Sequence, residues 1–472
     1  MQLIDGNLIQ VPDSLHSLTA YVIAEQGDWF EDEIRFVRIL LGAGERVIDI
    51  GANYGAYTLS MARSVGPQGR VWAIEPASAT ASNLRASVEL NDYAHVVVCQ
   101  YALGERAGKA RLSLHDNAEL NGLVIAQPGK RGSSGGRVEQ VRVMALDEFV
   151  GQQGIREVGF VKLDAEGAEG AIIAGAETFL ATESPLIQYE AKEGKTLHLD
   201  LADRFRERGY RSYRLIPGLN VLIPFDGDAD VDAFLLNLYA CKPDRAEILR
   251  TRGLLVDAPE VGFDAAEMRR RAASPDWLTD LTASPYAHSY ADPWQHWQAT
   301  DGVSGSGLKL AGALALFHHA RNPAVEPAVR VSALHASLDS LRDLTAETTS
   351  LTRLATLARV AREAGAQTVA VKALRRICNT IQKRPSVSFD EPFVAPTPRF
   401  DDVVATGGPK TWLTAAALEA YELNCAFSSY FTGPQALGQL RYYQALGYPS
   451  EVMAKRLKMI ERRFPPERSA GR

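Results

Sequence analysis

Residues 47–58 read V-I-D-I-G-A-N-Y-G-A-Y-T, and this is the most informative stretch of the chain. Its apolar beginning is typical of a buried strand that passes into a glycine turn and then into a helix, with Asp49 two positions before the first glycine. In a doubly wound sheet, ligands bind where the carboxyl ends of the strands meet the helix starts, and glycines let a ligand approach the backbone closely. The stretch therefore predicts a nucleotide-type cofactor, although any strand-turn-helix unit with glycine at its corner shows a similar pattern.

The spacing of the glycines separates two classes of cofactor. The pattern D-x-G-x-x-x-G at 49–55 differs from the dinucleotide fingerprint G-x-G-x-x-G, whose closely set glycines let a pyrophosphate sit against the helix N-terminus. S-adenosylmethionine carries no phosphate, so a looser turn suffices for it. We expect a backbone cradle for its amino-acid end, with Asp49 placed to meet the ammonium group directly or through water. The residues assigned to this cradle are Asp49, Gly51, Asn53, Gly55 and Thr58.

Three later strands end in residues that suit the same ligand. The strand predicted at 70–75 ends in a carboxylate about two dozen residues after Asp49, as an acceptor for ribose hydroxyls would. The run at 96–105 ends in small residues and a turn that suit an adenine ring, and the run at 159–169 places carboxylates just past a strand end. The residues predicted to bind the cofactor at these strand ends are Glu75, Pro76, Ala102, Leu103 and Asp164.

The motifs also follow one another in a characteristic order. D-I-G-A-N-Y-G is followed by I-E-P, L-N, A-L-G and finally K-L-D-A-E-G-A-E at 162–169, and Q-G-D-W-F-E-D-E stands upstream at 26–33. This combination resembles the FkbM-type methyltransferases over about residues 20–245, with Ala165 where that family usually has valine. The resemblance implies a class I, Rossmann-like fold, S-adenosylmethionine as cofactor, and methyl transfer to a hydroxyl oxygen, often of a sugar or a secondary metabolite.

The chemistry implied is an in-line displacement in which a hydroxyl oxygen attacks the methyl carbon of the sulfonium. An alcohol is a poor nucleophile until its proton begins to leave, so positioning and a general base are expected to supply most of the acceleration. The catalytic candidates are Asp164, as base or as the group that holds the sulfonium end, Glu190 at the end of the next strand, and Lys162 as an ion-pair partner. His198 is an alternative base, although a lone histidine at a helix start is more often structural.

Two further carboxylates, Glu166 and Glu169, stand on the turn and helix start after the fourth strand. Acidic residues at a helix N-terminus are also favoured by the helix dipole, by about 0.3–1 kcal/mol each. Several carboxylates at one crevice suit Mg²⁺, which prefers octahedral oxygen ligands. Like charges at such spacing either raise one another's pKa or recruit a cation, so the sequence assigns no metal.

The pattern of apolar runs predicts an α/β fold followed by an α-helical domain. Strands alternating with helical patterns indicate a doubly wound, mostly parallel sheet covered on both faces. The spacing of Leu197, Leu201 and Phe205 predicts one covering helix, and the glycine-rich stretch 129–136 predicts a flexible loop. The strands are expected near 46–50, 70–75, 96–101, 159–164 and 185–189, with 210–215 and 235–241 closing the sheet.

The alternation of strands and helices stops in the second half. We predict a methyltransferase domain at 1–245, an aromatic- and proline-rich linker at 246–307, and an α-helical domain at 308–472 that resembles a tetratricopeptide helix pair in part. The linker aromatics either form a carbohydrate-stacking surface or pin the linker onto a neighbouring domain. The helical domain offers a surface for a protein partner.

Composition excludes several classes of protein. With 51 basic and 57 acidic residues and a net charge of −6, the 472-residue chain has no general attraction to nucleic acid. No apolar run approaches a membrane span, and residues 1–11 lack the basic and apolar regions of a signal peptide. The four cysteines are far apart and mostly within apolar patterns, which is typical of reduced core residues. We therefore expect a cytoplasmic protein.

Three functions remain open from the sequence. The first is an S-adenosylmethionine-dependent O-methyltransferase that acts on a hydroxyl of a sugar, glycan or related metabolite. The second is a nicotinamide-dependent oxidoreductase on the same architecture, which the glycine spacing disfavours. The third is a helical interaction protein with a vestigial methyltransferase domain. The intact Asp49, Gly51, Gly55, Glu75 and Asp164 argue against such decay.

Overall fold

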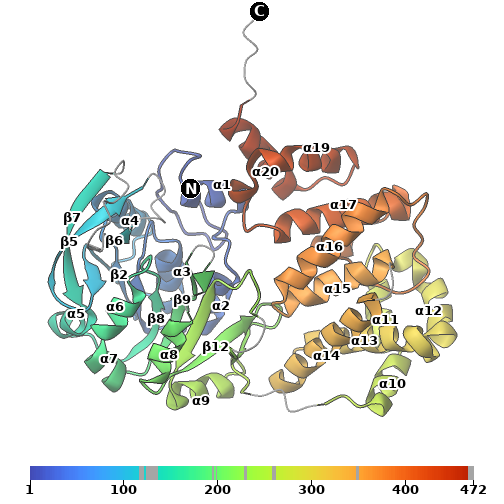
Figure 1. Cartoon of the computed structure of the whole chain (residues 1–472), viewed down its shortest axis with the longest axis horizontal. Helices are drawn as coiled ribbons and strands as arrows, with labels where there is room; N and C mark the ends of the chain where they lie inside the picture. Colours follow the sequence, from blue (N-terminus) through green and yellow to red (C-terminus); the bar gives the residue numbers. More distant parts are fainter. Residues whose placement is uncertain are drawn as a thin grey trace, which may run out of the picture. The chain divides into compact units, whose positions relative to one another are not determined.

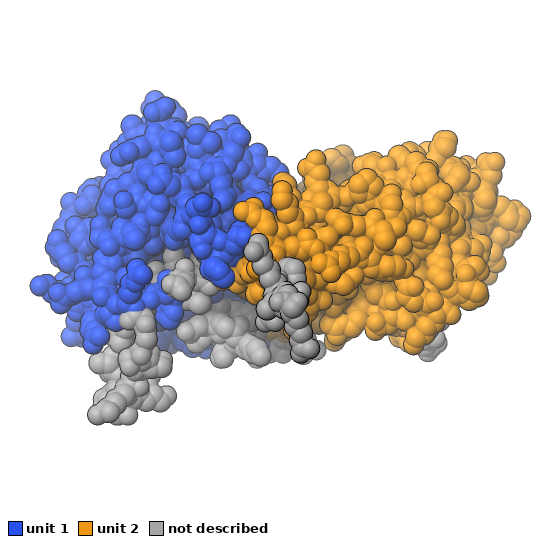
Figure 2. Space-filling model, turned by 90° about the horizontal axis from the view of Figure 1, so that it is seen from above, with its two compact units in different colours: residues 1–215, 224–230, 235–252 blue, residues 216–223, 231–234, 253–472 orange. Residues whose placement is uncertain are grey.

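The computed structural model describes residues 1–115, 122–123, 137–193, 196–197, 199–227, 231–257, 262–346 and 350–465 (Figure 1). The predicted loop at 129–136 and His198 lie outside these residues. The chain divides into two compact units, which Figure 2 shows in separate colours. The first unit is Met1–Leu215, Pro224–Asp230 and Leu235–Arg252, and the second is Ile216–Ile223, Val231–Phe234 and Gly253–Arg472.

A mostly parallel sheet forms the centre of the first unit. Seven of its strands lie in the spatial order β3-β2-β1-β8-β9-β14-β12. Neighbours from β3 to β9 pair in parallel, whereas β14 runs antiparallel to both β9 and β12. This arrangement confirms the predicted doubly wound α/β sheet. The strands are β1 (Arg46–Ile50), β2 (Arg70–Ile74), β3 (Val96–Cys99), β8 (Val158–Leu163), β9 (Leu186–Glu190), β12 (Arg211–Ile216) and β14 (Asn237–Cys241), and β12 is followed in the chain by β13 (Val221–Pro224).

Helices cover both faces of this sheet because parallel strands need crossover connections. On one face, Ile48, Val161 and Tyr189 share a buried core with α5 (Leu146–Gln153), α6 (Glu169–Ala174), α7 (Glu177–Thr182) and α8 (Asp200–Arg206). On the other face, Ala73 packs on Leu84, and the rings of Phe36 and Tyr239 lie 5.3 Å apart. The helices of this face are α2 (Asp32–Leu40), α3 (Ala56–Val65) and α4 (Ser78–Leu90), and α1 (Leu18–Gln26) and α9 (Pro243–Thr251) complete the helices of the unit.

A second, four-stranded sheet was missed by the sequence analysis. Its order is β4-β7-β5-β6, and its strands are β4 (Ala102–Gly104), β5 (Gly108–Leu114), β6 (Gly122–Leu123) and β7 (Arg137–Ala145). Along β5 and β7, only some positions are buried, such as Leu112 and Val141, and charged residues lie between them. The apolar residues are therefore too few to predict these strands from the sequence. A small hairpin, β10 (Lys192–Glu193) with β11 (Thr196–Leu197), precedes α8, so the helix predicted from Leu197 begins at Asp200.

The second unit is helical. Five consecutive helices pack successively on one another. They are α13 (Gly305–Arg321), α14 (Pro327–Ala346), α15 (Leu351–Glu363), α16 (Gln367–Ile381) and α17 (Gly408–Asn424). The remaining elements are α10 (Ala265–Ala273), α11 (Asp276–Ala283), η2 (His288–Tyr290), α12 (Ala291–Ala299), η3 (Asp301–Val303), η4 (Pro398–Asp402), α18 (Ser429–Thr432), η5 (Gly433–Ala436), α19 (Leu437–Ala445) and α20 (Glu451–Arg463).

The structure corrects the prediction of an irregular linker at 246–307. Much of this region is helical, because Pro275 and Pro293 stand at the starts of α11 and α12, where proline is tolerated. Its aromatic side chains are buried in the core of the second unit. The ring of Tyr286 stacks on Trp412 at 5.0 Å, and Trp294 donates a hydrogen bond to the carbonyl oxygen of Phe389 at 2.8 Å. These rings anchor the segment to the core instead of forming a stacking surface.

Candidate active site

A row of four polar side chains crosses four neighbouring strands of the first unit. Asp49 in β1 is in register with Lys162 in β8, Lys162 with Gln188 in β9, and Gln188 with Tyr239 in β14. We call these four residues the polar row. Residues in register share one face of a sheet, and all four side chains are buried. Interior strands of a doubly covered sheet are normally apolar, so a buried polar row requires partners.

Asp49 has one satisfied and one unsatisfied oxygen. Thr58, in the first turn of α3, donates a hydrogen bond to Oδ2 of Asp49 at 2.5 Å. Oδ1 is buried and has no hydrogen-bond partner in the structure. Burial raises the pKa of Asp49 above its usual value, although Lys162 opposes the rise. The predicted pair Asp49 and Thr58 is thus assembled, with one carboxylate oxygen left for a donor from outside the protein.

The turn between β1 and α3 needs its glycines for internal packing. Gly51 has a φ of +80°, and a Cβ there would lie 1.6 Å from the carbonyl oxygen of Asp164. Gly55 has a φ of +98°, and a Cβ there would lie 2.5 Å from Cδ1 of Leu84. The close approach predicted at Gly51 is therefore made by the chain's own backbone after β8. Asn53 adopts a φ of +50°, and its buried Oδ1 has no partner.

Glu75 follows directly after β2 and holds the neighbouring turns together. Its Oε2 accepts a hydrogen bond from the backbone N–H of Asn53 at 3.0 Å, and Oε1 accepts one from the N–H of Ala77 at 2.8 Å. Burial raises the pKa of Glu75 to about 7, although these two N–H groups oppose the rise. The carboxylate is therefore fixed beside the turn that carries Asn53, in the place predicted for a ribose acceptor.

Lys162 is the cation of the polar row. Its Nζ lies 2.5 Å from Oδ2 of Asp164 and 4.8 Å from the centre of the Tyr57 ring. Burial favours the neutral amine, but the carboxylates of Asp164, Asp49 and Glu31 outweigh it and raise the pKa of Lys162 above its usual value. Lys162 therefore stays charged inside the protein. It interacts with two of the carboxylates predicted for the site, Asp49 in β1 and Asp164 directly after β8.

Glu31 is a residue of this site that sequence reasoning missed. Its Oε2 accepts hydrogen bonds from the hydroxyl of Tyr57 at 2.6 Å and from Nδ2 of Asn237 at 3.2 Å. Nε2 of Gln188 in turn donates to the hydroxyl of Tyr57 at 3.3 Å. Burial raises the pKa of Glu31 above its usual value, although Lys162 opposes the rise. The sequence motif around Glu31 was recognised, but no spacing rule connects it to strands more than a hundred residues away.

The carboxylates after β8 and β9 have different roles. Glu169 accepts hydrogen bonds from the N–H groups of Ala165 at 2.7 Å and Gly167 at 3.3 Å, so it closes its own turn. Glu190 ends β9, and its pKa is raised to about 9, first by burial and then by repulsion from the carboxylates of Asp164, Glu166, Glu169 and Glu31. At neutral pH Glu190 therefore carries a proton.

The remaining predicted cofactor residues lie around β4 and the end of β2. Ala102 and Leu103 are buried in β4, where Ala102 packs with Ala77 and Leu103 joins the main core of the unit. Pro76 is half-buried between Glu75 and Ala77. Contact of these three with a cofactor stays a prediction.

Within the described part of the chain, no group of three or more His, Cys, Asp or Glu side chains is arranged to hold a metal ion. Among the same residues, no helix is long and apolar enough to cross a membrane. Cys99 and Cys241 are buried, Cys378 and Cys425 are half-buried, and none of the four forms a disulfide.

The strand order gives the first unit a class I methyltransferase fold, with five parallel strands and an antiparallel β14. Residues 49–212 match the methyltransferase FkbM domain. This agrees with the resemblance found in the sequence.

Three relatives each align with less than half of the chain. Methyltransferase 1 of Beauveria bassiana is 28% identical over 145 residues, which are 28% of this chain and 58% of that protein. The 31-O-demethyl-FK506 methyltransferase FkbM of Streptomyces tacrolimicus is 28% identical over 162 residues, which are 29% of this chain and 61% of that protein. The chain thus spans about three fifths of the length of these relatives. A crystal structure of methyltransferase FkbM from Methylobacillus flagellatus aligns with 18% identity and a TM-score of 0.29, over 49% of this chain and 56% of that one.

Proposed function

We propose that this chain is an S-adenosylmethionine-dependent O-methyltransferase that acts on a hydroxyl group of a sugar, glycan or related metabolite. The observation that carries this proposal is the imbalance of charge at the strand ends. Asp49, Asp164 and Glu31 gather around Lys162, and burial together with the charges of nearby carboxylates raises the pKa of Glu190 to about 9. A ligand with positive charge relieves the repulsion among these carboxylates.

The residues present fit such a ligand. S-adenosylmethionine carries an ammonium group and a sulfonium, and Oδ1 of Asp49 is a buried acceptor without a donor. Glu75 keeps acceptor capacity beyond its two backbone hydrogen bonds, because each carboxylate oxygen accepts more than one. Asp49 and Asn53 would hold the amino-acid end and Glu75 the ribose. When bound, the cofactor supplies an electrophilic methyl group.

The chain's own contribution to catalysis is to orient the acceptor and remove its proton. Asp164 is the base we propose, because its side chain is 30% exposed while Lys162 fixes the position of Oδ2. An alcohol attacks efficiently only as its proton is transferred to such a group. Glu190 becomes a second candidate only when a neighbouring cation lowers its raised pKa.

The test is methyl transfer by the purified full chain. The protein is incubated with S-adenosylmethionine labelled in its methyl group and with a panel of sugars, glycans and hydroxylated metabolites, and labelled products are identified by mass spectrometry and NMR. We expect label in a methyl ether. Label on nitrogen or carbon would reject O-methylation, and a chain that binds a nicotinamide cofactor but no S-adenosylmethionine would reject the proposal as a whole.

A further inference from the structure

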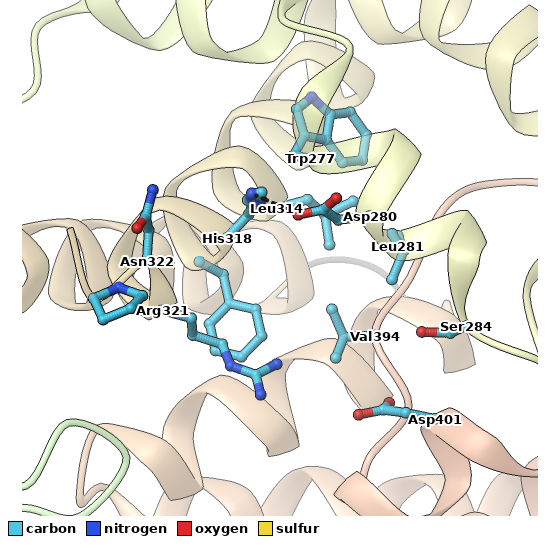
Figure 3. A pocket seen from close by; sticks show the side chains of 12 residues that line it. Trp277, Asp280, Leu281, Ser284, Leu314, His318, Arg321, Asn322, Val394 and Asp401 are labelled. Atoms are coloured by element: carbon cyan, nitrogen blue, oxygen red, sulfur yellow. Dashed lines mark ion pairs between the residues drawn. The ribbon is translucent and has the colours of Figure 1, made fainter. Parts of the chain in front are cut away.

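The second unit contains a pocket of about 540 Å³ between α11, α13 and the segment that leads into η4 (Figure 3). A volume of this order suits a small organic ligand, since such sites commonly measure about 300–1,000 Å³. Half of the lining residues are apolar and half are polar. The pocket belongs to no motif of the methyltransferase FkbM domain, whose match ends at residue 212.

One end of the pocket carries a histidine and an aspartate that contact each other. Nε2 of His318 lies 3.2 Å from Oδ2 of Asp280, and the side chain of Asp280 is 74% exposed. Burial lowers the pKa of His318, although Asp280 and Asp276 oppose the shift. At neutral pH His318 is therefore mostly uncharged, and the carboxylate of Asp280 keeps capacity to accept hydrogen bonds from a ligand.

The other end carries a cation and a second carboxylate, with Val394 between the two ends (Figure 3). The guanidinium of Arg321 lies over the ring of Phe317 at 5.4 Å, is about half exposed, and approaches Glu363 only to 3.9 Å. Asp401 accepts a hydrogen bond from buried Arg359 at 3.0 Å and remains 24% exposed. Arg321 thus presents donors to the pocket, and Asp401 presents an acceptor.

We propose that this pocket binds a neutral, hydroxyl-rich ligand, namely a sugar unit. Hydroxyl groups both donate and accept, so they match the carboxylates of Asp280 and Asp401 as well as the donors of Arg321. The apolar part of the lining, which includes Leu281 and Pro323, suits the C–H groups of a sugar ring.

Other ligand classes fit the lining less well. A phosphate or another anion meets two carboxylates, whose charges oppose it. A fully apolar ligand would bury the polar groups without giving them partners, which is unfavourable. The sugar site goes beyond methyl transfer and does not depend on it, because it is built from the second unit alone.

The test uses the full chain without cofactor on an array of neutral, sialylated and sulfated glycans, with inorganic phosphate as a competitor. Each neutral hit is then measured by calorimetry. Asp280→Asn and Arg321→Ala should each weaken binding by about tenfold or more, as expected when a charged hydrogen-bonding group is lost. Thermal melting of each variant shows that the fold is intact.

The chain offers a matched control pair outside the pocket. Asp339 and Arg342 in α14 are 72% and 47% exposed and lie 3.6 Å apart, close to the 74% of Asp280 and 50% of Arg321. Asp339→Asn and Arg342→Ala should leave glycan affinity unchanged. The proposal is overturned if no neutral glycan binds, if only acidic glycans or phosphate bind, or if the pocket variants bind as tightly as the control variants.

Discussion

Glu75 joins the ends of β1 and β2 because its two oxygens accept from the N–H groups of Asn53 and Ala77. Glu75→Gln replaces one acceptor with an NH₂ group that faces an N–H donor. We expect the affinity for S-adenosylmethionine to fall by about tenfold or more, which corresponds to about 1–3 kcal/mol for a lost buried hydrogen bond. Calorimetry measures the effect, with Glu89→Gln at an exposed position of α4 as the control. Equal affinities in the two variants would remove Glu75 from the site.

Glu190 makes the stability of the first unit depend on pH. Its folded pKa of about 9 lies above its ordinary value of 4.5, so the folded state holds the proton more tightly than the unfolded state. The stabilising contribution is fully present below the ordinary pKa and is lost as pH rises toward the folded pKa. Glu190→Gln, which resembles the protonated acid, should therefore raise Tm at about pH 8 more than at about pH 5.

The control for this variant is Glu148→Gln, at an exposed position of α5. It should change Tm little and by the same amount at both pH values. A pH-independent effect of Glu190→Gln would show that repulsion among the carboxylates does not hold a proton on Glu190.

The positive charge of Lys162 offsets the negative charges of the carboxylates around it, so removing this side chain should destabilise the first unit. Lys162→Met keeps the length of the side chain but leaves Asp164, Asp49 and Glu31 without their cation, at a cost of about 3–5 kcal/mol. In the double variant with Asp164→Asn, the loss should be smaller than the sum of the two single losses, because the two residues share one ion pair. Denaturant unfolding measures all three variants. Strict additivity would contradict a direct interaction.

At the level of elements, the turn after β1 depends on backbone packing at Gly51. Gly51→Ala places a Cβ at 1.6 Å from the carbonyl oxygen of Asp164 in addition to requiring a φ of +80°. Gly154→Ala is a matched control, since this glycine is left-handed with a φ of +63° and a ψ of 31°, and nothing lies within 4 Å of the added Cβ. The control should lose about 1–2 kcal/mol, and Gly51→Ala should lose several times more or fail to fold. Similar losses, measured by denaturant unfolding, would show that the backbone contact is unimportant.

The polar row explains why part of the site was predictable and part was not. Asp49, Glu75 and Asp164 stand directly at the ends of apolar runs, where the strand rule for α/β sheets locates ligands. Gln188 and Tyr239 are single polar residues inside strands, and only the register between distant strands reveals that they adjoin Lys162. Sequence spacing carries no information about that register.

Helices and strands, like the site residues, were predicted in part and missed in part. Most strands of the main sheet are rich in apolar residues, and the seven predicted strands lie within about two residues of the observed ones, a usual uncertainty for element ends. The strands β5 and β7 have few buried positions and were missed. The helices α11 and α12 were mistaken for a linker because Pro275 and Pro293 were taken as breaks when they mark helix starts.

At the level of the whole molecule, the two units are interleaved in sequence. Residues 216–223 precede the end of the first unit, yet Ile216, Leu219 and Ile223 belong to the buried core of the second. A fragment of residues 1–252 would expose these side chains, so we expect it to aggregate or to melt at a lower temperature than the full chain. Co-expression with residues 253–472 should restore solubility. A monodisperse fragment with the full Tm, by size exclusion and calorimetry, would contradict this.

The central claim is that the acidic strand ends of the first unit receive a cationic cofactor. Calorimetry of the full chain with S-adenosylmethionine, in two buffers of different ionisation enthalpy near neutral pH, measures affinity and proton release together. Because a bound cation lowers the raised pKa of Glu190, binding should release protons, and S-adenosylhomocysteine, which lacks the sulfonium charge, should release fewer. Glu190→Gln should bind with less proton release. Absence of binding, or equal proton release with both ligands and in the variant, would contradict the account.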